Sequence, residues 1–213
     1  MTDRPILFSA PMVRALLAGT KTQTRRVATE TTLPHLRRVG DFHLSTGAGL
    51  LTMNHYFRIP YAVGDRLYVR EAWKTHAAYD DISPAAMGGD EAILYVADGA
   101  HQTWGYPAIA KLGRFRQGMH MPRWASRLTL MVTDVRVQRL QDISEADAVA
   151  EGVQSVDGLF HIDHDHHAAS PITSYCGLWD SLNHDRGLGW DTNPWVVAVS
   201  FSVEHRDIDA EAP

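Results

Sequence analysis

Hydrophobic and polar residues alternate or cluster in five segments of the chain, and these patterns predict its strands. The clearest segment is 128–137, where apolar residues recur at alternate positions, as expected for a half-buried strand. Segment 66–73 alternates in a similar way, and 195–201 is an almost continuous apolar run. Apolar triplets at 6–8 and 94–96 predict two shorter strands.

Residues with capping chemistry mark the ends of two short helices. Pro11 suits the first turn of a helix, and Gly19 suits its end because glycine adopts left-handed backbone conformations without strain. Ser144 can cap a second helix with help from Asp147 three residues later. Gly152 then supplies the stop.

Segments without a sustained period separate these elements. Mixed polar, glycine and proline content predicts either a long irregular insertion or a floppy hairpin at 28–60, a loop at 75–93 and a polar insertion at 154–175. A short helix is expected at 179–182. Because strands and helices do not alternate regularly, we expect an α+β fold with short helices around a small mixed or closed sheet.

Composition narrows the class of protein. The chain has 213 residues, of which 45% are hydrophobic, enough for a sizeable core in one domain. The N-terminus does not resemble a signal peptide, and no apolar run approaches the roughly 18 residues of a membrane-spanning helix, so we expect a cytoplasmic protein without membrane contact. Cys176 is the only cysteine, and the net charge of -5 argues against coating nucleic acid by bulk electrostatics.

The segment after the first predicted helix carries the most reactive set of side chains. Lys21 is one of only three lysines in the chain, and a lysine amine can act as a base once burial lowers its pKa. Thr24 follows three residues later as a candidate nucleophile, and Arg25 and Arg26 can hold a developing oxyanion. The alternative is that these are ordinary residues of a surface loop.

Glu151 stands at an unfavourable position for a carboxylate. It falls in the last turn of its predicted helix, where a negative charge opposes the helix dipole by roughly 0.3–1 kcal/mol. Asp147, four residues earlier, adds a like-charge penalty of roughly 0.2–0.5 kcal/mol. Either Glu151 has a cationic partner such as a lysine, or it is solvated and tolerates both penalties.

The segment Leu17-Ala18-Gly19-Thr20-Lys21-Thr22-Gln23-Thr24-Arg25-Arg26 resembles the Gly-x-Lys-x-x-Thr-x-Arg signature of ASCH domains. Segments 143–152 and 195–201 look like the helix and the last strand of that family. Segments 64–73, 120–127 and 193–195 are similar to ASCH proteins of phage and prophage genomes. The resemblance implies a small PUA-like mixed β-barrel flanked by short helices, in one domain over residues 1–213 with long insertions near 28–60, 75–115 and 154–178.

Bacterial ASCH members that hydrolyse N4-acetylcytidine use a threonine nucleophile, a lysine base and a glutamate. By position, these functions fall on Thr24, Lys21 and Glu151. The resemblance implies a nucleoside substrate and no metal or cofactor. Four residues are candidates for substrate binding: Arg26 at the oxyanion, Phe8 against the pyrimidine, and Arg70 and Glu71 for recognition of the base.

Two other classes of function remain open on the sequence. One is a PUA-like module that binds RNA or a modified nucleotide, with or without ribonuclease activity, and the other is a phage accessory protein that acts through interactions. Aromatic and basic residues interleave in 104–127, as in proteins that stack bases and track phosphates, although Arg also lies over Trp on ordinary surfaces. The tract 161–167 holds four histidines and two aspartates, which suit either a divalent metal or a solvated loop.

Overall fold

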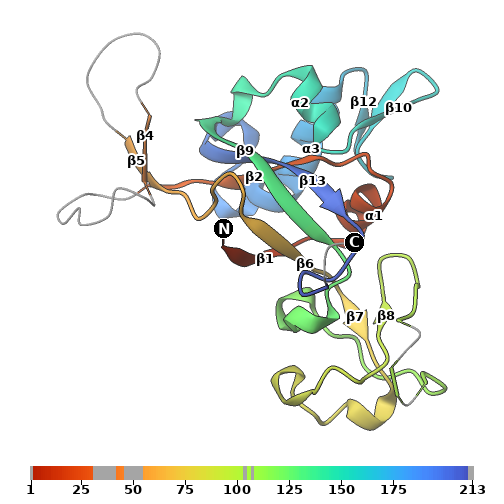
Figure 1. The fold of residues 1–213 in the computed structure, drawn as a ribbon. Helices are drawn as coiled ribbons and strands as arrows, with labels where there is room; N and C mark the ends of the chain where they lie inside the picture. Colours follow the sequence, from red (N-terminus) through yellow and green to blue (C-terminus); the bar gives the residue numbers. More distant parts are fainter. Residues whose placement is uncertain (1, 31–41, 46–54, 103–104, 107, 211–213) are drawn as a thin grey trace. The chain divides into compact units, whose positions relative to one another are not determined.

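A computed structural model describes residues 2–30, 42–45, 55–102, 105–106 and 108–210 of the chain (Figure 1). Its α-helices are α1 (Ala10–Leu17), α2 (Glu145–Ala150) and α3 (Pro171–Asn183). Its strands are β1 (Asp3–Leu7), β2 (Gln23–Val27), β3 (Thr29–Glu30), β4 (Phe42–Ser45), β5 (His55–Arg58), β6 (Arg66–Arg70), β7 (Trp73–Lys74), β8 (Leu94–Tyr95), β9 (Thr129–Arg139), β10 (Gln154–Val156), β11 (Leu159–His161), β12 (His167–Ala168) and β13 (Trp195–Glu204). Short 3-10 helices are η1 (Ala77–Tyr79), η2 (Pro84–Ala86), η3 (Gly118–His120), η4 (Arg123–Ala125), η5 (Leu140–Asp142), η6 (His184–Arg186) and η7 (Trp190–Thr192).

The largest sheet has five strands in the order β1-β6-β9-β13-β2, and Figure 1 shows β9 and β13 side by side. β1 runs parallel to β6, whereas β6 pairs with β9 and β13 pairs with β2 in antiparallel fashion. The mixed α+β class expected from the sequence is therefore confirmed. Among the described strands no pairing of β1 with β2 closes this sheet, so the structure does not show a barrel.

The chain divides into two compact units, each built from separate segments. The first unit comprises Met1–Gly19, Gly64–Met131 and Ser202–Pro213, and the second comprises Thr20–Val63 and Val132–Phe201. The divisions fall within the long strands β9 and β13 as well as in the connections.

The first unit starts with β1 and α1. The strand covers Asp3–Leu7 rather than the predicted 6–8, whereas the helix ends follow the sequence signals. Pro11 occupies the first turn of α1, whose Val13 and Leu16 are buried. Gly19 has a φ of +71°, a left-handed conformation that favours glycine just after a helix. A separate apolar cluster of this unit contains Trp73, Met87, Ile93, Tyr95, Met121 and Ala125.

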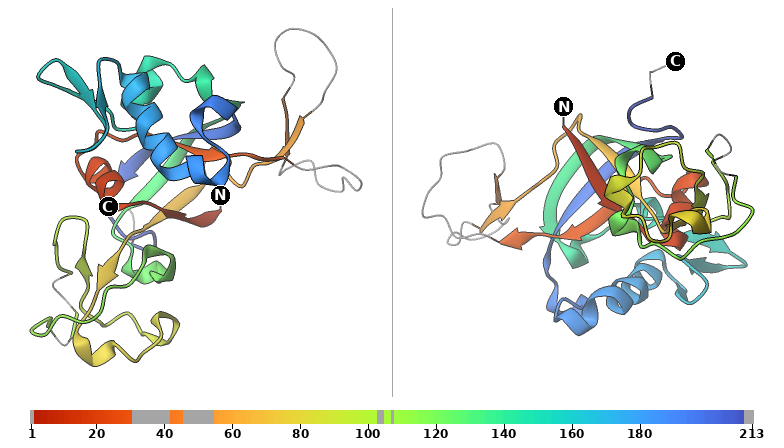
Figure 2. Two further views of the ribbon diagram at one scale, coloured as in Figure 1. Left: turned by 180° about the vertical axis from the view of Figure 1, so that it is seen from behind. Right: turned by 90° about the horizontal axis from the view of Figure 1, so that it is seen from below.

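The second unit packs α2 and α3 against its strands. β2 pairs with β13 so that Thr24 lies opposite Val199. The core of this unit contains Leu140, Ile143, Ala148, Val153, Tyr175, Trp179 and Val196. Tyr175 and Trp179 lie four residues apart and so share one face of α3, which Figure 2 shows alongside the strands.

The prediction for 154–175 was wrong in part, because this segment forms regular structure. β10, β11 and β12 make a three-stranded sheet, and α3 already begins at Pro171 rather than near 179. The first hairpin turns through Asp157 and Gly158, both with positive φ, between the paired residues Val156 and Leu159. Asp-Gly is a strong signal for such a two-residue turn.

Of the two alternatives for 28–60, the described residues favour the hairpin over the irregular insertion, since β3, β5 and β4 form a small antiparallel sheet. The rest of that predicted insertion, 31–41 and 46–54, lies outside the described residues.

None of the described helices has the length and apolar character needed to cross a membrane.

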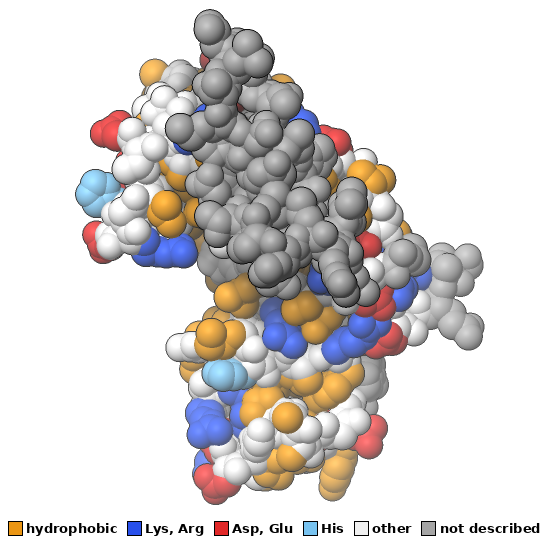
Figure 3. Space-filling view, turned by 90° about the vertical axis from the view of Figure 1, so that its left-hand side faces the viewer, with side chains coloured by type: hydrophobic (Ala, Val, Ile, Leu, Met, Phe, Trp, Pro, Cys, Tyr) orange, Lys and Arg blue, Asp and Glu red, His pale blue; other side chains and the backbone are white. Residues whose placement is uncertain are grey.

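Hydrophobic side chains also reach the surface. Figure 3 shows one face of the molecule, where they lie among Lys and Arg. In the first unit Leu7, Phe115 and Met119 are half-exposed. Apolar side chains scattered among charges are normal on a protein surface.

Candidate active site

The helix α2 holds the first charged residues of the site by means of its caps. The Ser144 hydroxyl accepts a hydrogen bond from the Asp147 backbone N–H at 3.0 Å, and the Asp147 carboxylate accepts one from the Ser144 N–H at 3.4 Å. This is the capping box that the sequence predicted. Glu151 is the residue at the C-terminal cap, and Gly152 follows with a φ of +110°.

Glu151 has a cationic partner, and it is Lys21. The Lys21 amine donates to the Glu151 carboxylate at 2.6 Å and to the Glu151 main-chain carbonyl at 2.9 Å. Lys21 is 1% exposed and Glu151 4% exposed. The amine therefore offsets both the carboxylate charge and the negative end of the helix dipole.

Burial controls the protonation of Lys21. Removal from water lowers the pKa of the amine, because the charged form loses its solvation. The negative charge of Glu151 acts in the opposite direction, and the positive charges of Arg26 and Arg25 lower the pKa further. The net result is an amine that loses its proton more readily than an ordinary lysine.

Arg25 bridges the carboxylates of Glu151 and Asp147. Its Nη1 lies 3.1 Å from Glu151 Oε1 and its Nη2 lies 3.1 Å from Asp147 Oδ2. Gln23 donates to Asp147 Oδ1 at 3.1 Å, and its own oxygen accepts from Arg25 at 2.6 Å. Strand β2 and helix α2 are thus joined by a buried network of opposite charges.

Asp147 belongs to this network, and the Tyr175 ring packs against it. Burial alone would raise the pKa of Asp147, but hydrogen bonds from Arg136 and Gln23 and the charge of Arg25 outweigh it and lower the pKa to about 2. The Tyr175 ring lies under the Arg25 guanidinium, 5.9 Å from its central carbon. Burial raises the pKa of the Tyr175 phenol well above its ordinary value, and the charge of Glu151 adds to this.

Thr24 lies between two members of the network but does not join it. Successive side chains of a strand point to opposite faces, so Thr24 and Arg26 lie on the face of β2 opposite to Gln23 and Arg25. Thr24 is 3% exposed. In the part of the chain that the structure describes, its hydroxyl forms no hydrogen bond with Lys21.

The other three predicted site residues belong to the first unit. Phe8 is buried, and its backbone N–H donates to the Arg70 carbonyl at 3.1 Å. Glu71 is buried and accepts two hydrogen bonds from Arg127, at 2.8 and 3.0 Å. The Arg70 guanidinium donates instead to the Tyr68 hydroxyl at 3.2 Å, so Arg70 and Glu71 have separate partners.

The histidine tract covers the end of β11, the loop 162–166 and the start of β12, and the His164 side chain in the loop is fully exposed. His161 on β11 and His167 on β12 are paired, with their rings stacked 5.1 Å apart. The His166 ring bonds the Asp163 carboxylate at 2.8 Å. Within the described residues no group of three or more His, Cys, Asp or Glu is placed to hold a metal ion.

Sequence reasoning expected Arg25 at an oxyanion and Asp147 at the helix cap, and it missed the ion pairs of Arg25 with Asp147 and Glu151 as well as the position of Tyr175. The spacing of Asp147 and Glu151 was a usable signal for a second cation beside Lys21, because two carboxylates four residues apart on one helix face repel each other. Tyr175 gave no such signal, since an aromatic residue at helical spacing is typical of any core.

Comparison with models of protein families, with curated proteins and with solved structures gives no match.

Proposed function

We propose that the chain is a metal-independent amidohydrolase that cleaves the N4-acyl amide of acylated cytosine nucleosides, of the N4-acetylcytidine type. The observation that carries the proposal is the buried Lys21 amine, whose pKa is lowered and which contacts Glu151. A buried amine with a perturbed pKa beside a carboxylate is suited to moving protons. The substrate class comes from the resemblance of residues 17–26 to ASCH domains. We include the PUA-like fold of that family in the proposal.

In the proposed reaction Lys21 takes the proton of the Thr24 hydroxyl, and the resulting oxygen attacks the carbonyl carbon of the N4-acyl group. Arg26, on the same face of β2 as Thr24, stabilises the oxyanion. The proton that Lys21 has taken from Thr24 passes by way of Glu151 to the departing N4 nitrogen, so that cytidine leaves and the acyl group remains on Thr24. Water then cleaves this ester, which releases the carboxylic acid and restores the hydroxyl.

This sequence of steps requires the Lys21 amine to exchange its bond with Glu151 for one with Thr24. Thr24 lies on the face of β2 opposite to Arg25, so the exchange requires the backbone between Lys21 and Thr24 to turn. Because Lys21, Thr24 and Glu151 are all buried, a substrate reaches them only when the side chains around them move.

A second candidate function is favoured by the position of Thr24 outside the network. If Lys21 and Arg25 only fasten β2 to α2, the domain acts as a PUA-like module that binds RNA or a modified nucleotide. Such a module forms a salt-dependent complex with RNA, because binding releases counterions from the phosphates. It releases no cytidine.

The test is incubation of the full chain with N4-acetylcytidine, followed by chromatographic measurement of cytidine and acetate. The hydrolase predicts turnover that Thr24→Ala abolishes. Thr22→Ala is the matched control, since Thr22 lies in the same segment but is exposed. Absence of cytidine, together with salt-dependent RNA binding in fluorescence anisotropy, would favour the binding module.

A further inference from the structure

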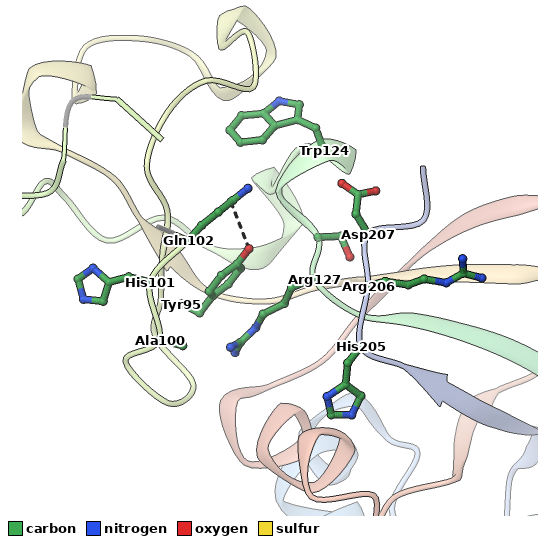
Figure 4. Close-up of a pocket in the computed structure, with 10 residues that line it drawn as sticks. Tyr95, Ala100, His101, Gln102, Trp124, Arg127, His205, Arg206 and Asp207 are labelled. Carbon is green, nitrogen blue, oxygen red and sulfur yellow. Dashed lines mark hydrogen bonds between the residues drawn. The ribbon is translucent and has the colours of Figure 1, made fainter. Parts of the chain in front are cut away.

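A cavity of about 340 Å³ lies wholly within the first unit. Three segments contribute to it: β8 with the residues after it, η4 with the residues that follow, and 205–207 near the C-terminus. In Figure 4 the side chains of Trp124, Gln102 and Asp207 converge on this space, whereas that of Arg206 extends away.

The arginines that line the cavity are already neutralised. Arg127 donates to both oxygens of Glu71, at 2.8 and 3.0 Å, and to both oxygens of Asp98, at 2.9 and 3.0 Å. Its guanidinium also covers the Tyr95 ring, 4.0 Å from the centroid. Arg206 is paired with Glu204 at 2.7 Å. Because carboxylates already neutralise both guanidinium groups, neither arginine is well suited to bind a phosphate or another anion in the cavity.

What the cavity offers a ligand is an aromatic surface, an amide and a carboxylate. The Asp207 Oδ1 accepts the Asp209 backbone N–H at 2.7 Å, which fixes the carboxylate, and among the described residues Oδ2 accepts no hydrogen bond. The Tyr95 hydroxyl has one proton, which it can donate to the Ala125 carbonyl at 3.0 Å or to the Gln102 oxygen at 3.4 Å. When it donates to the Gln102 oxygen, the Gln102 NH₂ group is left as a donor for a ligand.

These groups match one pattern among the common nucleobases. A carboxylate binds best to two adjacent N–H donors, which guanine presents at N1 and N2, and guanine O6 beside them can accept from an amide NH₂. Adenine and cytosine present a ring nitrogen lone pair next to their amino group, which repels a carboxylate. Uracil presents a single N–H between two carbonyls.

We propose that this cavity binds a guanine base or nucleoside, stacked on Trp124, with its N1–H and N2–H₂ donated to Asp207 and its O6 accepting from Gln102. Stacking on an aromatic side chain stabilises a bound base whatever its identity. Asp207 and Gln102 then decide which base is bound. This site involves none of the residues Lys21, Thr24 and Glu151, so it stands apart from the proposed hydrolysis.

The test is isothermal titration calorimetry of the full chain with guanosine, inosine, adenosine and cytidine. Guanosine is expected to bind, and inosine, which lacks only the exocyclic amino group, to bind about tenfold more weakly. Adenosine and cytidine are expected to bind more weakly than inosine. No heat with guanosine, or equal affinity for guanosine and inosine, would overturn the proposal, as would tighter binding of guanosine monophosphate through a phosphate contact.

Variants assign the effect to the cavity. Asp207→Asn keeps the oxygen that accepts the Asp209 N–H but replaces the second acceptor with a donor, so guanosine should lose at least about tenfold in affinity. Asp81→Asn, at an exposed position of the same unit, is the matched control. Unchanged guanosine affinity in Asp207→Asn would exclude this site. Thr24→Ala should leave guanosine binding intact, which separates this proposal from the hydrolase.

Discussion

The Lys21 amine donates to both the carboxylate and the main-chain carbonyl of Glu151, a residue 130 positions away in the chain. The carboxylate stands at the C-terminal end of α2, where without a partner it would oppose the helix dipole. The amine in turn has lost most of its contact with water. The first three predictions below concern this pair.

Replacing Lys21 by arginine tests its function as a base. Arginine keeps the positive charge but cannot release its proton at working pH, so Lys21→Arg should reduce hydrolysis of N4-acetylcytidine by about 10²- to 10⁴-fold. Lys111→Arg, at an exposed lysine, is the control. Activity close to that of the wild type in Lys21→Arg, with unchanged thermal unfolding, would remove the proposed base.

Removing one member of the buried pair should destabilise the protein more than removing both. Glu151→Leu leaves Lys21 and Arg25 without their shared carboxylate, at a cost of about 3 kcal/mol. The double variant Lys21→Met, Glu151→Leu should recover part of this loss. Urea denaturation measures both values, and equal stability of the single and double variants would mean that the pair is not coupled.

The pH dependence of hydrolysis should report the lowered pKa of Lys21. The base form is the neutral amine, so kcat/KM should rise as pH increases through that pKa and level off above it. The midpoint should lie below 10.5, the ordinary value for lysine. Steady-state rates across a pH series measure it. A rate that does not change across the series would contradict this assignment.

Acid should weaken the second unit through Asp147. Its pKa is about 2 in the folded protein, against 3.8 for an ordinary aspartate, so its ion pairs stabilise the fold above about pH 4 and are lost as pH falls through about 2. The contribution is about 2 kcal/mol at neutral pH. Asp147→Asn should flatten the loss of stability between pH 4 and pH 2 in urea unfolding. Asp185→Asn, an exposed position in the same unit, should follow the wild type.

Chelation should leave hydrolysis unchanged, because a hydroxyl nucleophile with an amine base needs no Lewis acid. The measurement is the rate of cytidine release before and after dialysis against EDTA. Loss of activity that zinc or manganese restores would instead direct attention to the paired histidines His161 and His167.

Local signals in the sequence were sufficient for most of the regular elements. The alternation in 128–137 predicted β9, the apolar run from Trp195 predicted β13, and Ser144 predicted the start of α2. These features depend on residues within a few positions of one another, so the sequence carries them directly. The Asp157-Gly158 turn was equally local, and the hairpin that it closes was missed by giving too much weight to polar composition.

The sequence by itself determined that Glu151 stands at an unfavourable helix end and that Lys21 is a candidate base. Only the tertiary structure decided that these two meet, that Arg25 rather than Thr24 shares the carboxylate, and that Asp207 lies in one cavity with Trp124. The physical reason is that such contacts join residues far apart in the chain. They depend on how strands pair and helices pack, which no local pattern of residues specifies.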